Sequence, residues 1–332
     1  MTSPIPTTPT DSPSDITSDS APDSASGPTP GPTPGSASDS VAASRARDSL
    51  LALSVGDAFG AQFFVPENLP RLRNRQLPQA PWPWTDDTEM ACAVYAELAV
   101  QGHIDQDRLA ASFARHHDFD RGYGPTVNRM LRLIRKGRPW RELAAEPFEG
   151  TGSWGNGAAM RVAPLGAWFA DDPARAAREA AASAAVTHQH PEGIAGAVAV
   201  AAATALACRP GPVDPAAFIA AVATATPPGL VRQRLHAAST LAGRTDPAQV
   251  GRTLGNGRRV SAPDTVPFTV WVAAHYPDNF EAALWATSSA GGDVDTTCAI
   301  VAGILGARVG PDGIPAAWRR AAEPLPAWST AT

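Results

Sequence analysis

Apolar residues recur at helical spacing along most of the 332-residue chain. Over residues 45–63, leucine, valine and alanine side chains fall at the three- and four-residue intervals of one helical face. Further helices are predicted over residues 85–99, 106–115, 125–135, 141–145, 158–169, 173–186, 193–207, 215–225, 230–241, 266–275, 280–288, 295–309 and 315–321. Alternating β-branched stretches, which are typical of strands, are nearly absent. The pattern therefore predicts an all-α fold.

The first 44 residues have a different composition. They contain 11 Ser, 9 Pro and 7 Thr, and no Lys, Arg or aromatic side chain. Such a segment has too little apolar surface to offset the entropy lost on ordering it. The composition predicts a disordered tail over residues 1–44, a single all-α domain over residues 45–332, and within that domain a proline-rich loop over residues 66–83.

Charge and cysteine usage exclude several classes of protein. The formal net charge of −5 lies entirely in the tail, so that residues 45–332 are neutral, which argues against a general nucleic-acid binder. Cys92, Cys208 and Cys298 lie far apart without a CxxC pair, which argues against a zinc knuckle or a disulfide framework. No apolar run approaches the roughly 18 to 20 residues that span a membrane, and the N-terminus lacks the pattern of a secretory signal. The protein is expected to be soluble and cytoplasmic.

Two acidic clusters, far apart in the sequence, each open a predicted helix. The first is Thr85-Asp86-Asp87-Thr88, and the second contains Asp293 and Asp295 within residues 291–297. Carboxylates at a helix start can complement the helix dipole or cap free N–H groups. Together with the threonine hydroxyls they also form a set of hard oxygen donors, which suits Mg²⁺ or Mn²⁺. Since Asp293 and Asp295 cannot both be the N-cap, the two clusters are candidates to face each other and hold a pair of divalent cations.

Three other motifs have a structural and a functional interpretation. Asp57 lies between Gly56 and Gly60, whose spacing favours close helix packing; whether Asp57 joins the metal site stays open. The glycine-rich loop over residues 150–157 can present N–H groups to a phosphate, but it lacks the lysine of a P-loop. His188 and His190 follow Thr187, and one of these histidines is a candidate for hydrogen bonding or stacking rather than for metal binding.

Taken together, these motifs resemble the ADP-ribosylglycohydrolase family over residues 45 to about 328. The resemblance rests on Gly56-Asp57-Ala58-Phe59-Gly60, Trp84-Thr85-Asp86-Asp87-Thr88, the stretch from Ser153 to Arg161, Thr187-His188, and Gly292-Asp293-Val294-Asp295-Thr296. It implies an orthogonal multi-helix bundle with two divalent cations, Mg²⁺ or Mn²⁺, at the base of an ADP-ribose cleft.

The resemblance also implies roles for individual residues. The implied metal ligands are Thr85, Asp86, Asp87, Asp293, Asp295 and Thr296. The implied substrate-binding residues are Gly122, Tyr123, Gly124, Gly152, Ser153, Trp154, Gly155, Asn156 and His188. Asp87 or Asp295 would be the catalytic residue that accepts a proton from the attacking water.

The implied reaction is hydrolysis of the bond between ribose C1″ and an acceptor, which releases ADP-ribose from an ADP-ribosylated protein or small molecule. Phe64 stands where many relatives carry a glutamate, so we expect N-linked acceptors such as arginine to be favoured over serine. Two alternatives stay open, namely a non-catalytic protein of the same fold that binds ADP-ribose or metal, and a metal-dependent phosphohydrolase. The residues do not choose between Mg²⁺ and Mn²⁺, and they do not identify the acceptor, the oligomeric state or the role of the tail.

Overall fold

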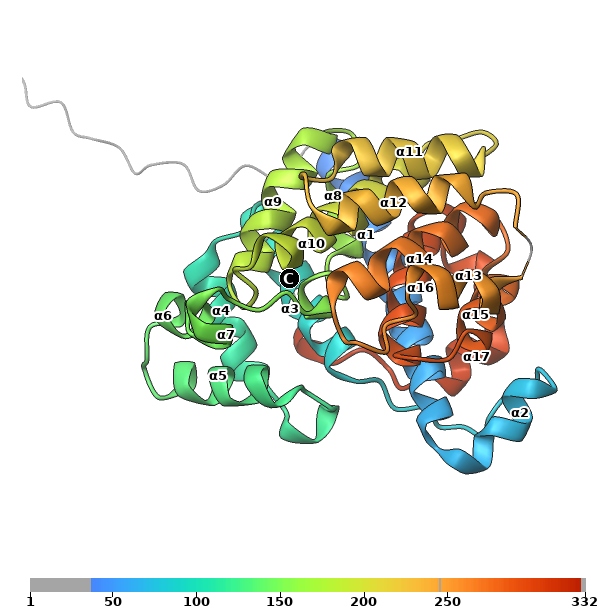
Figure 1. Cartoon of the computed structure of the whole chain (residues 1–332). Coiled ribbons are helices and arrows are strands. Elements are labelled where there is room, and N and C mark those ends of the chain that lie inside the picture. Colours follow the sequence, from blue (N-terminus) through green and yellow to red (C-terminus); the bar gives the residue numbers. More distant parts are fainter. Residues whose placement is uncertain (1–36, 245, 330–332) are drawn as a thin grey trace, which may run out of the picture. The chain divides into compact units, whose positions relative to one another are not determined.

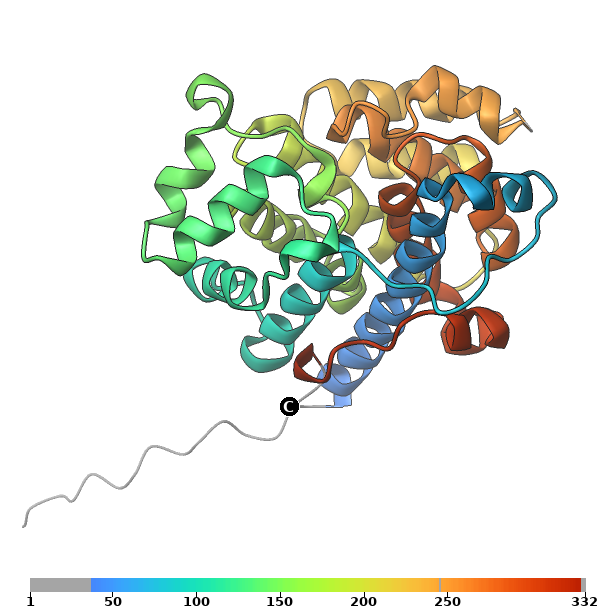
Figure 2. The ribbon, with the colours of Figure 1, turned by 90° about the horizontal axis from the view of Figure 1, so that it is seen from below.

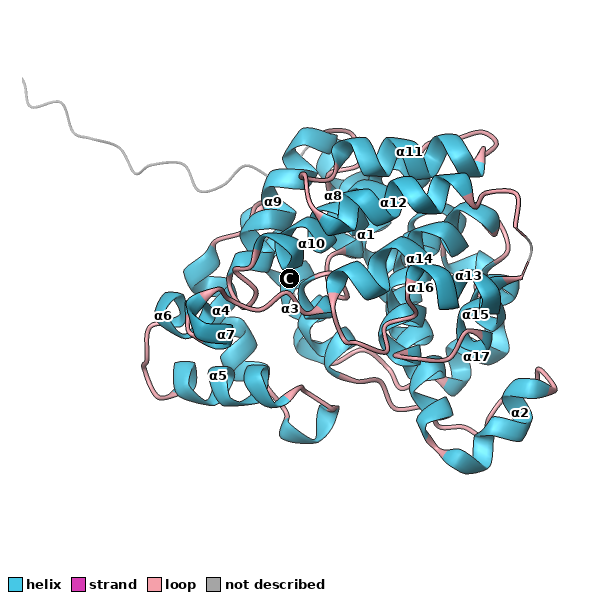
Figure 3. Ribbon diagram, in the orientation of Figure 1, coloured by secondary structure: helices cyan, strands magenta, loops and turns pink. Residues whose placement is uncertain are grey.

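The computed structural model describes residues 37–244 and 246–329, and helices make up most of them (Figure 1). The helices are α1 (Ala37–Ala61), α2 (Leu69–Arg73), α3 (Asp86–Gln101), α4 (Gln106–His116), α5 (Pro125–Arg135), α6 (Trp140–Ala145), α7 (Pro147–Gly150), α8 (Ala163–Trp168), α9 (Pro173–Ala185), α10 (Pro191–Ala207), α11 (Pro215–Ala225), α12 (Leu230–Thr240), α13 (Pro247–Leu254), α14 (Ala262–His275), α15 (Phe280–Ser289), α16 (Val294–Val309) and α17 (Ala316–Ala321). The described residues contain two isolated bridges and no strand (Figure 3). The all-α prediction is confirmed.

Side-chain caps explain why many helices begin where the sequence predicts. The Asp105 carboxylate accepts hydrogen bonds from the N–H groups of Asp107 (2.9 Å) and Arg108 (3.0 Å) at the start of α4. Asp172 and Asp214 cap α9 and α11 in the same way, and in both helices a proline follows the cap. These local signals place helix starts without any help from tertiary packing.

Several segments differ from the sequence-based expectation. The predicted boundary between residues 44 and 45 falls inside α1, because this helix already begins at Ala37; residues 1–36 of the predicted tail lie outside the described residues. The predicted loop over residues 66–83 contains the short helix α2. Helix α13 was not predicted, although Asp246-Pro247 is the same cap signal that starts α9 and α11, and Asp246 accepts from the N–H of Ala248 at 3.0 Å.

The predicted helix over residues 158–169 is α-helical only from Ala163 to Trp168. A 3₁₀ turn, Asn156–Ala158, precedes it, and the chain between the two is irregular. Arg161 lies in this irregular stretch and donates to the carbonyl of Gly157 at 3.2 Å. The chain therefore leaves the glycine-rich loop through a turn, and a new helix starts beside Pro164.

Glycines bring α1 and α16 into close contact. A Cβ atom at Gly60 would lie 2.5 Å from the carbonyl oxygen of Val294, and a Cβ at Gly56 would collide with Ala302. In Figure 2, which is viewed from below, α1 (blue) lies beside the C-terminal segment (red). The packing interpretation of these glycines is confirmed, and it places Asp57, which lies between them, next to the start of α16.

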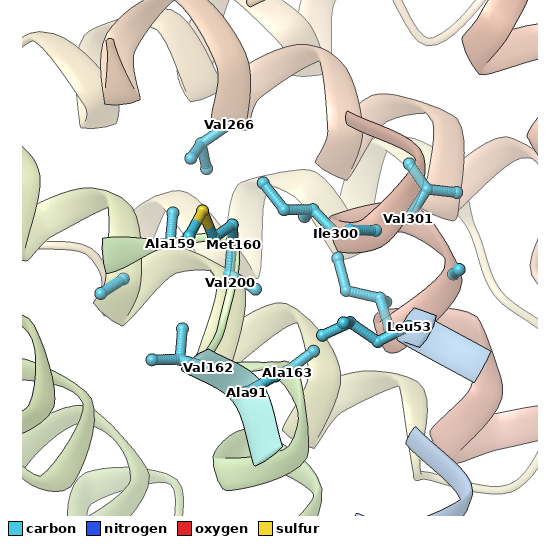
Figure 4. Close-up of a cluster of buried hydrophobic side chains, with 14 of the residues drawn as sticks. Leu53, Ala91, Ala159, Met160, Val162, Ala163, Val200, Val266, Ile300 and Val301 are labelled. Carbon is cyan, nitrogen blue, oxygen red and sulfur yellow. The ribbon is translucent and has the colours of Figure 1, made fainter. Parts of the chain in front are cut away.

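The buried core joins this helix pair to the glycine-rich loop. Figure 4 shows Leu53 of α1 and Ile300 of α16 in one apolar cluster with Met160, which follows the loop. Val200 of α10 and Val266 of α14 complete this side of the cluster. The end of the loop is thus anchored in the core. Within the described residues no single helix is long and apolar enough to cross a membrane, and one bent pair, Ser40–Phe64 with Pro66–Arg73, meets the requirement only jointly.

Candidate metal centre and substrate cleft

Helix α3 begins with a threonine cap, which leaves its two aspartates available. The Thr85 hydroxyl accepts from the N–H of Asp87 at 3.4 Å, so neither Asp86 nor Asp87 is the N-cap. Asp87 is buried, and its Oδ1 has no hydrogen-bond partner. Its Oδ2 lies 3.0 Å from the Thr85 hydroxyl and 3.4 Å from the Thr296 hydroxyl. The capping explanation therefore does not account for these carboxylates.

Asp57, whose role the sequence left open, lies in the same cluster of carboxylates. Its Oδ2 accepts from the N–H of Thr85 (2.9 Å) and from the N–H and hydroxyl of Thr88 (3.1 and 2.6 Å). Carboxylate oxygens of Asp57, Asp87 and Asp295 all lie within 4.8 Å of one another. Asp57 thus ties α1 to the start of α3 and brings a third carboxylate to the centre.

The second acidic cluster meets the first from the start of α16. Asp293 makes no side-chain cap, and its Oδ2 accepts from the Asn156 amide at 2.7 Å. Asp295 Oδ1 accepts from the N–H of Thr296 at 2.7 Å. The structure therefore brings together two clusters that are some 200 residues apart, and Asn156 links Asp293 to the glycine-rich loop.

Burial and mutual repulsion disfavour the charged form of the aspartates in the cluster. Burial and the neighbouring Asp57 raise the pKa of Asp86 to about 8. Burial, followed by the charges of Asp57 and Asp295, raises the pKa of Asp87 well above its usual range. Burial and Asp293 do the same to the pKa of Asp295. Oxygen-only donors, an unpartnered buried carboxylate oxygen and mutual repulsion fit a hard divalent cation, which would compensate the negative charge.

The repulsion predicts how pH affects the metal-free protein. The pKa of Asp86 in the folded state is about 8, above the roughly 3.9 of an unfolded aspartate. The folded state thus binds more protons between these values. The free energy of unfolding should therefore fall as pH rises between these two pKa values. The slope is about 1.4 kcal/mol per pH unit for each additional proton that the folded state binds relative to the unfolded state. Since a cation relieves the repulsion, excess Mg²⁺ should raise Tm more at about pH 8 than at about pH 5.

Thermal denaturation of metal-stripped protein at the two pH values, with and without Mg²⁺, measures this difference. Asp86→Asn is the control variant, because it removes one of the titrating carboxyls and should reduce the pH dependence. An equal rise in Tm from Mg²⁺ at both pH values would contradict the inferred repulsion between these carboxylates.

A cleft of about 550 Å³ opens above the acidic cluster. The predicted site residues that line it are Asp86, Asp87, Gly122, Gly124, Ser153, Trp154, Gly155, Asn156, His188, Asp293, Asp295 and Thr296. Thr85, Tyr123 and Gly152 do not line it. Thr85 lies behind Asp87, hydrogen-bonded to Asp57, and a Cβ at Gly152 would meet the backbone nitrogen of His190 at 2.8 Å. Gly152, a predicted substrate-binding residue, thus has a packing role in the structure.

Tyr123, a predicted substrate-binding residue, points to Glu89 instead of the cleft. Its hydroxyl donates to Glu89 Oε2 at 2.6 Å, and the same oxygen accepts from the N–H of Asp118 at 3.1 Å. Glu89 is buried on α3, one turn after Asp86. The Glu89–Tyr123 pair therefore holds the loop of Gly122 and Gly124 against the helix that carries the acidic cluster. The sequence signal that could have drawn attention to Glu89 is its three-residue spacing from Asp86, which places both residues on the same side of α3.

Sequence reasoning assigned no role to several other cleft residues; of these, Gly157 and Met160 lie in the Ser153–Arg161 stretch, and the rest lie in no recognised motif. The full set is Met90, Pro125, Thr126, Val127, Phe148, Gly157, Met160, Arg259 and Val260. Phe148 and Val260 have positive φ values, 55° and 49°, which are rare for such side chains. The carbonyl of Trp154 accepts from the N–H of Ala262 at 3.0 Å, which fixes the Val260 loop beside the glycine-rich loop. Backbone strain of this kind clusters at ligand sites.

Solved structures place this fold in a known class. The chain is similar to a structure described as an ADP-ribosylglycohydrolase-related protein complex, with a TM-score of 0.61 and 26% identity, over 86% of this chain and 94% of that one. The all-α fold is therefore shared with a structure related to the ADP-ribosylglycohydrolases.

The sequence comparisons are more specific. The profile of the ADP-ribosylglycohydrolase family matches residues 38–330, and the chain belongs to this family. It is 30% identical to the human (Homo sapiens) ADP-ribosylhydrolase ARH3 over 276 residues, which cover 72% of this chain and 74% of that protein. It is 27% identical to the ADP-ribosyl-(dinitrogen reductase) glycohydrolase of Rhodospirillum rubrum, over 82% of this chain and 88% of that protein. The protein is thus a glycohydrolase enzyme.

Proposed function

We propose that the protein hydrolyses the bond between ribose C1″ and an acceptor and releases ADP-ribose, with two divalent cations, Mg²⁺ or Mn²⁺, held by the acidic clusters. The observation that carries the proposal is the convergence of the Asp57, Asp87 and Asp295 carboxylates within 4.8 Å, at the base of the cleft of a member of this family. The names of the relatives, which describe removal of ADP-ribose, support the substrate class. The cleft volume of about 550 Å³ is in the usual range for sites of ligands of this size.

The cleft offers a separate contact for each part of ADP-ribose. Phe148 and Trp154 are 58% and 42% exposed although they are large apolar rings, and both line the cleft, so they suit stacking on a nucleobase. The loops of Gly122, Gly124 and Gly155 let the backbone approach the diphosphate. The ribose at the other end would then lie over the acidic cluster.

The carboxylates supply the chemistry of this chain. Bound divalent cations would lower the pKa of a water and orient it. Asp87 or Asp295 would accept the proton of the attacking water, because both reach the base of the cleft. Positive charge that develops on the ribose ring would be stabilised by the surrounding aspartates. Asn156 would hold Asp293 in place through their 2.7 Å hydrogen bond.

Product analysis tests the proposal. The full chain would be stripped of metal, reloaded with Mg²⁺ or Mn²⁺, and incubated with ADP-ribosylated arginine and serine peptides. Free ADP-ribose that forms only after reloading is the expected product. AMP or inorganic phosphate would indicate a phosphohydrolase, and tight ADP-ribose binding without turnover would indicate a non-catalytic member of the fold. Full activity of the stripped protein would contradict the metal requirement.

The set of carboxylates predicts the acceptor. The acidic residues that line the cleft are all aspartates of the two clusters, and Phe64, where many relatives carry a glutamate, is 53% exposed and does not line it. A guanidinium nitrogen leaves as a stabilised species, whereas a serine alkoxide needs more help from an acid. We expect the wild type to cleave the arginine linkage at least about tenfold faster than the serine linkage, a difference of roughly 1.4 kcal/mol in the barrier.

A carboxylate that reaches the cleft from this position should narrow the difference in rate between the two linkages, and Phe64→Glu tests this. Phe64→Gln, which has the shape of glutamate without its charge, is the matched control. Initial rates on the two peptides measure the ratio. Efficient hydrolysis of the serine linkage by the wild type would show that the missing glutamate does not limit acceptor choice.

A further inference from the structure

Arg161 carries a buried charge beside the cleft and has no carboxylate partner among the described residues. Its Nη2 donates to the carbonyl of Ser183 at 2.7 Å, and its Nη1 donates to the Thr187 hydroxyl at 2.9 Å. The guanidinium carbon lies 4.7 Å from the ring centroid of Phe113. Burial lowers the pKa of Arg161 to about 9, so the side chain stays protonated near neutral pH. Burying such a charge is costly. We therefore ask what the hydrogen bonds of Arg161 do for the residues that accept them.

The hydrogen bond from Arg161 fixes the direction of the next one. A guanidinium has only donors, so Thr187 Oγ1 must accept from it. Thr187 Oγ1 also lies 2.7 Å from His188 Nδ1, and both side chains are buried. His188 Nδ1 is the one acceptor that the described residues offer to the Thr187 hydroxyl hydrogen. An unpaired buried hydroxyl hydrogen is unfavourable, so Thr187 donates and Nδ1 accepts.

His188 must then carry its proton on the other nitrogen. Burial, together with the charge of Arg161, lowers the pKa of His188 to about 3, so the ring is neutral and holds one proton. Since Nδ1 accepts, the proton is on Nε2. This atom lies at the glycine-rich loop, where a Cβ at Gly155 would meet it at 3.1 Å, and His188 lines the cleft. The opposite tautomer would present a lone pair to the cleft and repel the oxygens of a phosphate.

We propose that Arg161 and Thr187 are positioning residues that hold His188 as the neutral Nε2–H tautomer and so give the cleft a fixed donor for an oxygen of ADP-ribose. The identity of the ligand rests on the function proposed above. The direction of the hydrogen bonds rests only on the side chains of this chain. Because the donor is preset, ligand binding requires no proton rearrangement at His188.

Thr187 provides the sharpest test, because removing the buried Arg161 would disturb the fold. Thr187→Val keeps the shape and removes the hydroxyl, whereas Thr187→Ser keeps the hydroxyl. The control is Thr204→Val, which removes another buried hydroxyl, bonded to the carbonyl of Val200 at 2.9 Å. By calorimetry with ADP-ribose, Thr187→Val should raise Kd about tenfold, or roughly 1.4 kcal/mol. Thr187→Ser and Thr204→Val should bind like the wild type.

Nuclear magnetic resonance of the metal-free protein with ¹⁵N-labelled histidine reads the tautomer directly, and His188→Gln assigns the signal. We expect a protonated Nε2 in the wild type and a mixture of tautomers in Thr187→Val. A wild-type proton on Nδ1, or unchanged tautomer and Kd in Thr187→Val, would overturn the inference. Neither readout needs turnover, so a protein that binds ADP-ribose with this tautomer but releases none from any acceptor would contradict only the proposed function.

Discussion

Asp295→Asn is expected to lower turnover of an ADP-ribosylated substrate by at least about a thousandfold while the fold stays intact. The substitution removes one of three carboxylates whose oxygens lie within 4.8 Å, and an amide is a poor replacement for a charged ligand and for a proton acceptor. Asp293→Asn should act in the same direction, since it also weakens the hydrogen bond from Asn156.

Stability should respond in the opposite sense to activity. Burial and the charge of Asp293 raise the pKa of Asp295, so removal of this carboxylate relieves repulsion in the metal-free protein and should leave Tm unchanged or higher. Turnover and Tm of Asp295→Asn are to be compared with those of Asp312→Asn, which neutralises an exposed aspartate. If Asp293→Asn and Asp295→Asn both kept the activity of the wild type, the aspartates at the start of α16 would have only a structural role.

Gly60→Ala is expected to destabilise the protein by about 2 to 3 kcal/mol and also to impair catalysis. The added Cβ would lie 2.5 Å from the carbonyl oxygen of Val294 and 2.7 Å from the Cα of Asp295. Both atoms belong to backbone, so the start of α16 must move to make room for the methyl group. That movement displaces the Asp295 carboxylate from Asp87.

Chemical denaturation, together with turnover at saturating Mg²⁺, measures the two effects. Gly243→Ala is the matched control, because no atom lies within 4 Å of a Cβ placed there. A loss of stability without a loss of turnover would show that α16 shifts as a unit and keeps the acidic cluster in place. No loss of stability would contradict the close contact of α1 with α16.

Local signals were sufficient for much of the secondary structure. The predicted bounds of 125–135 and 215–225 are those of α5 and α11, because proline and capping residues act on the first turn without tertiary help. The predicted helix over residues 158–169 was wrong in its first part, where side-chain contacts override the local helical pattern. The chain around Arg161 is not helical, because this side chain turns inward to the carbonyls of Gly157 and Ser183. No helical period reveals such contacts.

The sequence by itself determined the all-α class, the two acidic clusters and the family resemblance, because helix periodicity and motifs of adjacent residues are local properties. Only the tertiary structure decided that Asp57 joins Asp87 and Asp295 in one acidic cluster, that Tyr123 turns to Glu89, and that Phe148 and Val260 reach the cleft. Each of these depends on contacts between elements distant in the chain. Side-chain direction at such contacts is set by packing and by the pairing of buried polar groups, which no local pattern encodes.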